Sequence, residues 1–454
     1  MAEIPYTCKR TVVSTKPVQP GKRFPLSVLD RLMEPRHLRI VYYYRSGNPG
    51  RKAGEWTRTL RESLARTLTS FPKATGRLQR DGEGRWEIEC NDAGVRAVEA
   101  RARGSVEDWL RNAEREDELR LVHWEEMFDA PYFWSTFYVQ MTEFEGGGFA
   151  IGLSCIHLLA DPICATMFIK AWADMTLKAQ LAAPPLFHPL PKRQPGHQNE
   201  PNHNTSLINH YKSSINTPSP APGAKFATLS LSFAEPIVRS CVAAAQPVDQ
   251  HVHWPGLSPF KALAGLFWAC ISKVRGNREG LVSMCLGLDV RKLLGLEREF
   301  FGNCMVYSNS LHAGDNEEDN SLPGAAKAIG EIMAKLDKNG VMDLIGWLEL
   351  NDISHPESAR SLNFPELLFL NLEGIGPHTA RFEHAHSPIQ VSCYFEPPCG
   401  QGQVVILPSA TEDAPMSRVV MVTLREDELA KLLEDDLLKS FSPTILMGVN
   451  RNRA

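Results

Sequence analysis

The sequence has no excess of charge of either sign. Its 454 residues carry 49 basic and 53 acidic side chains, which gives a formal net charge of −4. A nucleic-acid-binding domain usually shows a strongly basic patch or stripe, and electrostatic binding to an anionic membrane needs a basic cluster. The charge balance supports neither class of protein, and we expect no nucleic-acid partner.

Metal-binding motifs and long apolar runs are also missing. The ten cysteines contain no CxxC pair, so neither a zinc ribbon nor a thioredoxin-like site is predicted, and we expect no metal. Their scattered positions are typical of free thiols in a reducing compartment. No run approaches the about 20 apolar residues of a membrane-spanning helix, and the N-terminus lacks a hydrophobic signal core. We therefore expect a cytoplasmic protein without a transmembrane segment.

The length and the periodicity of the chain predict two domains of the α/β class. A chain of this length is too long for one ordinary core, and runs typical of strands alternate with amphipathic helical runs. Residues 183–225 contain nine prolines and little apolar periodicity. This composition predicts a long surface linker between an N-terminal domain, residues 1–182, and a C-terminal domain, residues 226–454.

A strand, a histidine and a helix follow one another within residues 148–176. Residues 149–156 have the length and composition of a buried strand, and His157 comes directly after them. Asp161 is placed to cap the following helix, and Pro162 suits its first turn. His157 would then lie at the mouth of a strand, where a rigid scaffold can hold a base. The alternative is a core histidine whose ring is bonded to a backbone carbonyl.

Six short motifs occur in an order that resembles one known family. They are HLLAD at 157–161, ATGRL at 74–78, NDAGV at 91–95, SPFKALAGLFW at 258–268, DVR at 289–291 and FFGN at 300–303. Along nearly its whole length the chain resembles the BAHD family of plant acyl-CoA-dependent acyltransferases, whose signature is HxxxD. The resemblance implies two chloramphenicol-acetyltransferase-like domains of mixed sheet plus helices, with a channel at their interface. Part of residues 365–395 would cross to the first domain.

The resemblance also implies roles for three residues. His157 would be the general base that deprotonates an alcohol or amine acceptor, and it would then protonate the leaving CoA thiolate. Asp161 would be structural, held at the helix start and paired with Arg291 of the second domain. The alternative is that these two are unrelated surface charges. Acyl-CoA would be a co-substrate, and no cofactor is implied.

Several segments resemble one branch of this family, the eceriferum/glossy branch. They are LSVLDRLMEPRHLRIVYYYR at 26–45, ECNDAGVRAVEA at 89–100, VEDWL at 106–110, FAIGLSCIHLLAD at 149–161 and LLFLNLEGIG at 367–376. This resemblance implies a role in very-long-chain fatty acid elongation for cuticular wax. The protein would act beside the elongase condensing enzyme, a 3-ketoacyl-CoA synthase, at the cytosolic face of the endoplasmic reticulum. Apart from that partner, a monomer is expected.

Two departures from the family pattern leave the activity open. The family's DFGWG motif is replaced by Leu372, Glu373, Gly374, Ile375 and Gly376. The glycine usual after HxxxD is replaced by Pro162, which fixes φ and removes a donor. Two hypotheses follow. One is an accessory protein that lets an elongase make longer acyl chains, and the other is an O- or N-acyltransferase that uses His157 as its base.

Overall fold

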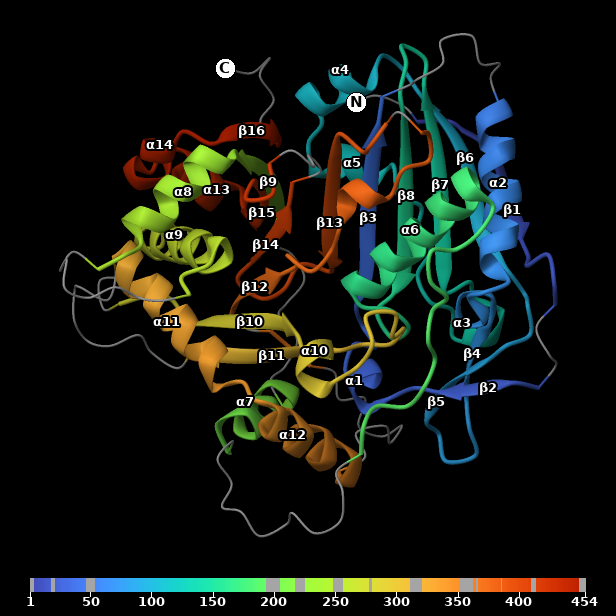
Figure 1. Cartoon of the computed structure of the whole chain (residues 1–454), viewed down its shortest axis with the longest axis horizontal. Coiled ribbons are helices and arrows are strands. Elements are labelled where there is room, and N and C mark those ends of the chain that lie inside the picture. The colour runs from blue at the N-terminus through green and yellow to red at the C-terminus, as the bar shows by residue number, and fades with distance from the viewer. Residues whose placement is uncertain are drawn as a thin grey trace.

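Two large β-sheets, each with its own helices, lie side by side in the computed structural model (Figure 1). The structure describes residues 4–17, 21–45, 54–192, 205–216, 225–247, 256–276, 280–310, 321–351, 362–364, 366–384, 386–409 and 414–448. Both sheets contain parallel and antiparallel pairs. The predicted α/β class with mixed sheets is confirmed.

The first sheet has six strands in the order β1-β6-β7-β8-β3-β13. Helices α2 (Glu55–Leu68) and α6 (Pro162–Lys178) lie together on one face, and α4 (Val106–Asn112) and α5 (Arg115–Leu119) belong to the same half (Figure 1). A separate small sheet, β2-β5-β4, adjoins this half. The strands are β1 (Tyr6–Val12), β2 (Arg23–Pro25), β3 (His37–Tyr44), β4 (Arg77–Arg80), β5 (Trp86–Glu89), β6 (Val95–Ala102), β7 (Phe137–Phe144), β8 (Phe149–Ile156) and β13 (Gln390–Glu396).

The second sheet has seven strands in the order β11-β10-β12-β14-β15-β9-β16. One face is covered by apolar side chains of five helices, which form a separate core with the sheet. The strands are β9 (Phe226–Phe233), β10 (Met284–Asp289), β11 (Met305–Ser310), β12 (Leu367–Asn371), β14 (Gln403–Pro408), β15 (Arg418–Arg425) and β16 (Thr444–Met447). The helices are α8 (Glu235–Ala244), α9 (Pro259–Val274), α11 (Leu322–Lys335), α13 (Glu426–Leu433) and α14 (Asp436–Phe441).

One sequence expectation needs correction. Residues 183–225 are not all surface linker, because residues 205–216 form helix α7 (Thr205–Asn216) with Leu207, Tyr211 and Ile215 buried. The Tyr211 hydroxyl accepts a hydrogen bond from the Tyr307 amide of β11 at 2.9 Å. Between residues 322 and 350 the chain forms two helices, α11 and a second that Asp337 caps, α12 (Lys338–Leu350).

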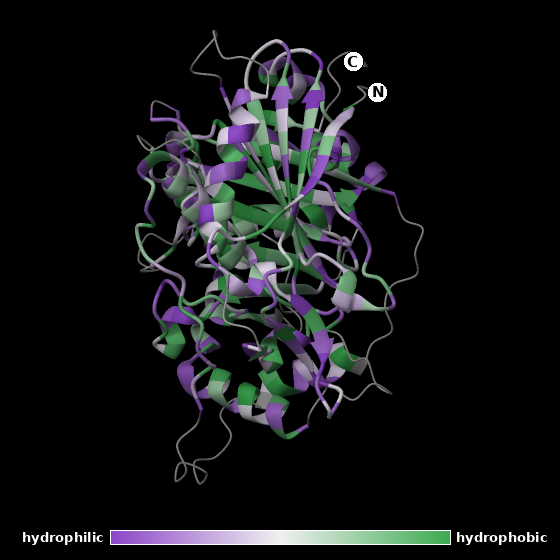
Figure 2. Ribbon diagram, turned by 90° about the vertical axis from the view of Figure 1, so that its right-hand side faces the viewer, coloured by the Kyte–Doolittle hydropathy of each residue, from purple (hydrophilic) through white to green (hydrophobic). Residues whose placement is uncertain are grey.

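The apolar core is continuous across the two halves. Side chains of β8 and α6 belong to the same buried cluster as side chains of β11, β12, α7 and α12. Figure 2 shows the hydrophobic residues concentrated along the strands in the middle of the molecule, with hydrophilic residues towards the outside. In the part of the chain that the structure describes, no helix combines the length and apolar character needed to cross a membrane.

Strand β13 joins the C-terminal half of the chain to the first sheet, because it pairs with β3 in antiparallel register. A fully buried carboxylate, Glu118 of α5, lies at this junction. It accepts hydrogen bonds from Tyr43 at 2.8 Å, from Ser392 at 2.6 Å and from the Tyr394 hydroxyl. Burial raises the pKa of Glu118, and the three hydroxyl donors oppose that shift. The carboxylate therefore ties α5 to both strands.

Replacing Glu118 with glutamine is expected to lower the free energy of unfolding by about 1–2 kcal/mol, because an amide N–H₂ would then face hydroxyl donors. Urea unfolding followed by circular dichroism measures the difference. Glu62→Gln on the exposed face of α2 is the matched control and should change stability by no more than about 0.5 kcal/mol. Equal stability of the two variants would contradict the conclusion that Glu118 stabilises the contact of α5 with β3 and β13.

Candidate functional site

His157 follows the last residue of β8 and precedes α6. Its backbone N–H donates to the Arg36 carbonyl at 2.9 Å, and its own carbonyl accepts a hydrogen bond from Asn303 Nδ2 at 2.6 Å. The whole residue is buried, with 0% of its surface exposed. Both backbone polar groups of His157 are therefore fixed by residues from outside the HxxxD motif.

The imidazole ring of His157 has no hydrogen-bond partner at either nitrogen among the described residues. It packs edge-to-face against Phe395 of β13, with ring centroids 5.1 Å apart. The core-histidine alternative requires a backbone carbonyl bonded to the ring. No such bond reaches hydrogen-bond geometry among the described residues, although the ring lies close to its own backbone carbonyl and to the Asn303 side chain. Burial lowers the pKa of His157 while the nearby Asp161 carboxylate opposes the shift. The ring is therefore neutral at pH 7 and has a lone pair available to accept a proton.

Asp161 and Arg291 are brought together as a buried ion pair, with 0% and 5% of their side chains exposed. Arg291 Nη2 donates to Oδ1 of Asp161 at 3.0 Å and to Oδ2 at 2.8 Å. The carboxylate also accepts the N–H of Cys164 at 2.9 Å, as the N-cap of α6, and the N–H of Cys304 at 2.9 Å. Pro162 occupies the first turn of this helix, where its missing N–H leaves no intrahelical bond unmade.

Arg291 also holds the chain segment around it through further hydrogen bonds. Nη2 also donates to the Gly302 carbonyl at 2.7 Å, and Nη1 donates to Asp289 Oδ1 at 2.8 Å. Asp161 comes from the first half of the chain and Arg291 from the second. This pair therefore connects the two halves, four residues after His157 in the sequence. The Asp161 carboxylate already accepts four hydrogen bonds, which fits a structural role and not that of a base.

Two residues without a predicted role at the site, Asn303 and Asp30, support His157. Asp30 Oδ1 accepts hydrogen bonds from the backbone N–H of Asn303 at 3.0 Å and from its Nδ2 at 2.8 Å. Asp30 is itself held in a capping box with Ser27 at the start of α1 (Val28–Arg31). Asn303 thus links this capped helix to the His157 carbonyl. The S-x-x-D spacing at residues 27–30 was the signal that could have pointed to this support.

The segment that replaces DFGWG is a packed loop after β12. Leu372 is fully buried, and Glu373 accepts a hydrogen bond from Arg418 Nε at 2.6 Å. Gly374, Ile375 and Gly376 line a pocket of about 430 Å³ beside α6, which Lys170 and Arg298 also line. The loop therefore offers backbone and apolar surface to this pocket, with neither an aspartate nor an indole.

Nearly the whole chain matches one known protein family. A family model described as the Transferase family matches residues 2–437. The chain belongs to the BAHD transferase family. Among relatives, "Protein ECERIFERUM 26-like" of Arabidopsis thaliana is 27% identical over 431 residues, covering 93% of this chain and 92% of its own. "Hydroxycinnamoyltransferase" of Narcissus pseudonarcissus is 26% identical over 442 residues, covering 93% and 96%.

Solved structures confirm the fold expected for this family of acyl-CoA-dependent acyltransferases. Vinorine synthase matches with a TM-score of 0.71 at 19% identity, over 98% of this chain and 100% of its own. TRI101 of F. sporotrichioides, solved with coenzyme A and T-2, matches with a TM-score of 0.69 at 16% identity, over 93% and 99%. The two chloramphenicol-acetyltransferase-like domains are therefore shown. Because eceriferum and hydroxycinnamoyl relatives are equally similar, these likenesses establish the family and leave the branch to be argued.

Proposed function

We propose that this BAHD-family protein promotes very-long-chain fatty acid elongation for cuticular wax, together with a 3-ketoacyl-CoA synthase. The observation that carries the proposal is the loop at residues 372–376. Its Leu372 and Ile375 are buried, and Glu373 is paired with Arg418. The altered sequence is therefore well packed, although it lacks the aspartate and the aromatic residues of DFGWG. The likeness to "Protein ECERIFERUM 26-like" over 93% of the chain agrees with this branch, but the hydroxycinnamoyltransferases are equally similar, so the altered loop is the argument for it.

The protein would act at the cytosolic face of the endoplasmic reticulum as a monomer apart from its partner. In this role the protein would offer a surface that contacts the condensing enzyme, and the condensing enzyme would form the carbon–carbon bond. The buried Asp161–Arg291 pair would serve to keep the two halves in one arrangement. Turnover at His157 would not be needed.

Co-expression in yeast with a 3-ketoacyl-CoA synthase tests the proposal. Fatty acyl chains longer than those made by the condensing enzyme alone are expected, measured by gas chromatography of total fatty acyl esters. Co-purification of the two proteins is expected as well. A chain-length profile identical to that of the condensing enzyme alone, with the protein present in the membrane fraction, would refute the role.

Acyl transfer is the second candidate, and it rests on the neutral, unpartnered imidazole of His157. One ring nitrogen would take the proton of an alcohol or amine as its oxygen or nitrogen attacks the thioester carbonyl of acyl-CoA. The tetrahedral intermediate then collapses with cleavage of the carbon–sulfur bond. The CoA thiolate leaves and receives the proton from the imidazolium. The products are an ester or amide and free CoA, and the base is regenerated.

A further inference from the structure

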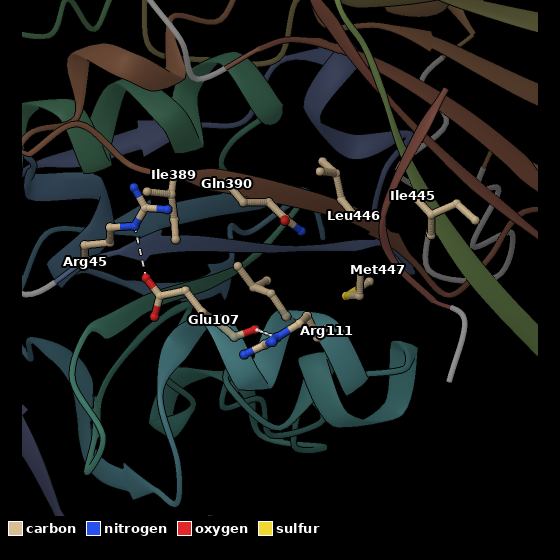
Figure 3. Close-up of a pocket in the computed structure, with 9 residues that line it drawn as sticks. Arg45, Glu107, Arg111, Ile389, Gln390, Ile445, Leu446 and Met447 are labelled. Carbon is tan, nitrogen blue, oxygen red and sulfur yellow. Dashed lines mark hydrogen bonds and ion pairs between the residues drawn. The ribbon is translucent and has the colours of Figure 1, made fainter. Parts of the chain in front are cut away.

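A second pocket lies between the two halves, lined by α4, the start of β13 and β16 (Figure 3). Its volume is about 350 Å³, within the range of small-molecule sites. Strand β3 pairs with β8 so that Tyr44 lies opposite Phe149 and His37 opposite Ile156. His157 is therefore at one end of β3 and the pocket at the other, next to Arg45. Seven residue steps separate the two ends, or roughly 24 Å.

The walls of this pocket are mainly aliphatic. Leu446 and Met447 come from β16, Leu110 from α4, and Ile389 precedes β13. Such a lining favours the apolar body of a ligand over water, because filling it removes apolar surface from water at about 25 cal/mol per Å². Leu446 remains partly exposed, so the pocket is open to solvent on one side.

One buried polar group in the wall lacks a partner. Gln390, with 5% of its surface exposed, lines the pocket, and its Nε2 has no hydrogen-bond partner among the described residues. Figure 3 shows its amide extending towards Leu446 and Met447. Gln390 can therefore offer N–H donors to an acceptor in the pocket.

Two guanidinium groups stand at the rim. Arg45 donates through Nε to Glu107 at 3.0 Å, and its two Nη groups have no partner among the described residues. Arg111 is held on α4 by the Glu107 carbonyl at 3.3 Å and by the Asp108 carboxylate. Guanidinium donors match a carboxylate in geometry as well as in charge. The Glu107 carboxylate also lines the pocket, but it is paired with Arg45 Nε, so an anionic head group fits the rim on the side of the Arg45 Nη groups, and an apolar body fits the walls.

We propose that this pocket binds an amphipathic carboxylate of medium chain length, such as a free fatty acid, at a site separate from His157. The carboxylate lies between the Arg45 guanidinium and the Gln390 amide, and the alkyl chain lies along Leu110, Ile389 and Met447. Binding involves no covalent step. This binding proposal does not depend on whether the protein acts in elongation or in acyl transfer, because none of the residues that line the pocket belongs to the HxxxD motif or to the 372–376 loop.

Decanoate below its micelle concentration is the probe, added to the full-length protein labelled with ¹³C at the methionine methyl groups. A saturable shift of the Met447 methyl signal is expected. Met167, which lines the pocket beside α6, serves as the internal reference for binding near the transferase motif. A shift at Met167 with none at Met447, or no saturable shift at all, would overturn the proposal.

Variants separate carboxylate recognition from apolar filling. Gln390→Leu and Arg45→Gln are each expected to weaken decanoate binding by about three- to tenfold, and Leu110→Trp should abolish it by filling the pocket. Arg58→Gln, on the exposed face of α2, should leave the affinity unchanged. Arg45 is largely exposed, so its variant folds whatever Gln390 contributes. Unchanged affinity in Arg45→Gln and Gln390→Leu, or equal binding of decanol, would reject the carboxylate site.

Discussion

Replacing Arg291 with alanine is expected to lower the free energy of unfolding by about 3–5 kcal/mol. Asp161 is fully buried, so the variant would leave its carboxylate without the cation that makes the charge tolerable there. The two backbone N–H donors, of Cys164 and Cys304, would remain and would recover only part of the loss. The Gly302 carbonyl would also lose its donor. Urea unfolding followed by circular dichroism and by tryptophan fluorescence measures the change.

Two further variants make this prediction specific. Arg58→Ala removes an arginine whose side chain is 73% exposed and paired with Glu62, and it should cost no more than about 0.5 kcal/mol. Arg291→Lys keeps the charge but cannot match the several donors that the guanidinium supplies, so an intermediate loss is expected. An Arg291→Ala variant as stable as Arg58→Ala would show that the buried pair contributes little to holding the halves together.

Local patterns along the chain predicted the centre of the molecule well. The apolar run before His157 is strand β8, buried at all eight positions, and the aspartate–proline pair begins α6 as its cap and first turn. These features depend on neighbours in sequence. The association of Asp161 with Arg291 rested on the family resemblance, because no local pattern connects residues 130 positions apart.

Local sequence patterns could not predict which distant segments would pair. The family resemblance implied that part of residues 365–395 would cross to the first domain, but it did not identify the strand that this part would join. The pairing of β13 with β3 joins residues about 350 positions apart, and the Phe395 ring beside His157 follows from it. Helix α7 was missed for another reason. Its Leu207, Tyr211 and Ile215 recur every four residues, but the prolines on both sides dominated the composition of the range. Burial against β11 and α12 stabilises a helix that its own length would leave marginal.

Replacing His157 with alanine is expected to divide the two candidate functions. If the protein transfers acyl groups, the variant should lose about 10²- to 10⁴-fold in rate, the usual contribution of a positioned general base. The assay follows release of CoA thiol from a long-chain acyl-CoA with a panel of alcohols and amines. If the protein acts with a condensing enzyme, the same variant should keep the longest chains in yeast. His188→Ala, which removes a partly exposed histidine bonded to Glu297, is the matched control for both assays.

The pH dependence gives this experiment a second readout. Because burial lowers the pKa of His157 below 6.5, the base stays neutral down to that pH, and the acid limb of kcat/KM is expected below pH 6.5. A structural role for the ring would produce no such limb, and His157→Gln would then retain full activity. Transfer that survives in His157→Ala, with a pH profile like that of the natural protein, would remove His157 as the base. Loss of the longest chains by a folded His157→Ala variant would instead count against the accessory role and in favour of catalysis.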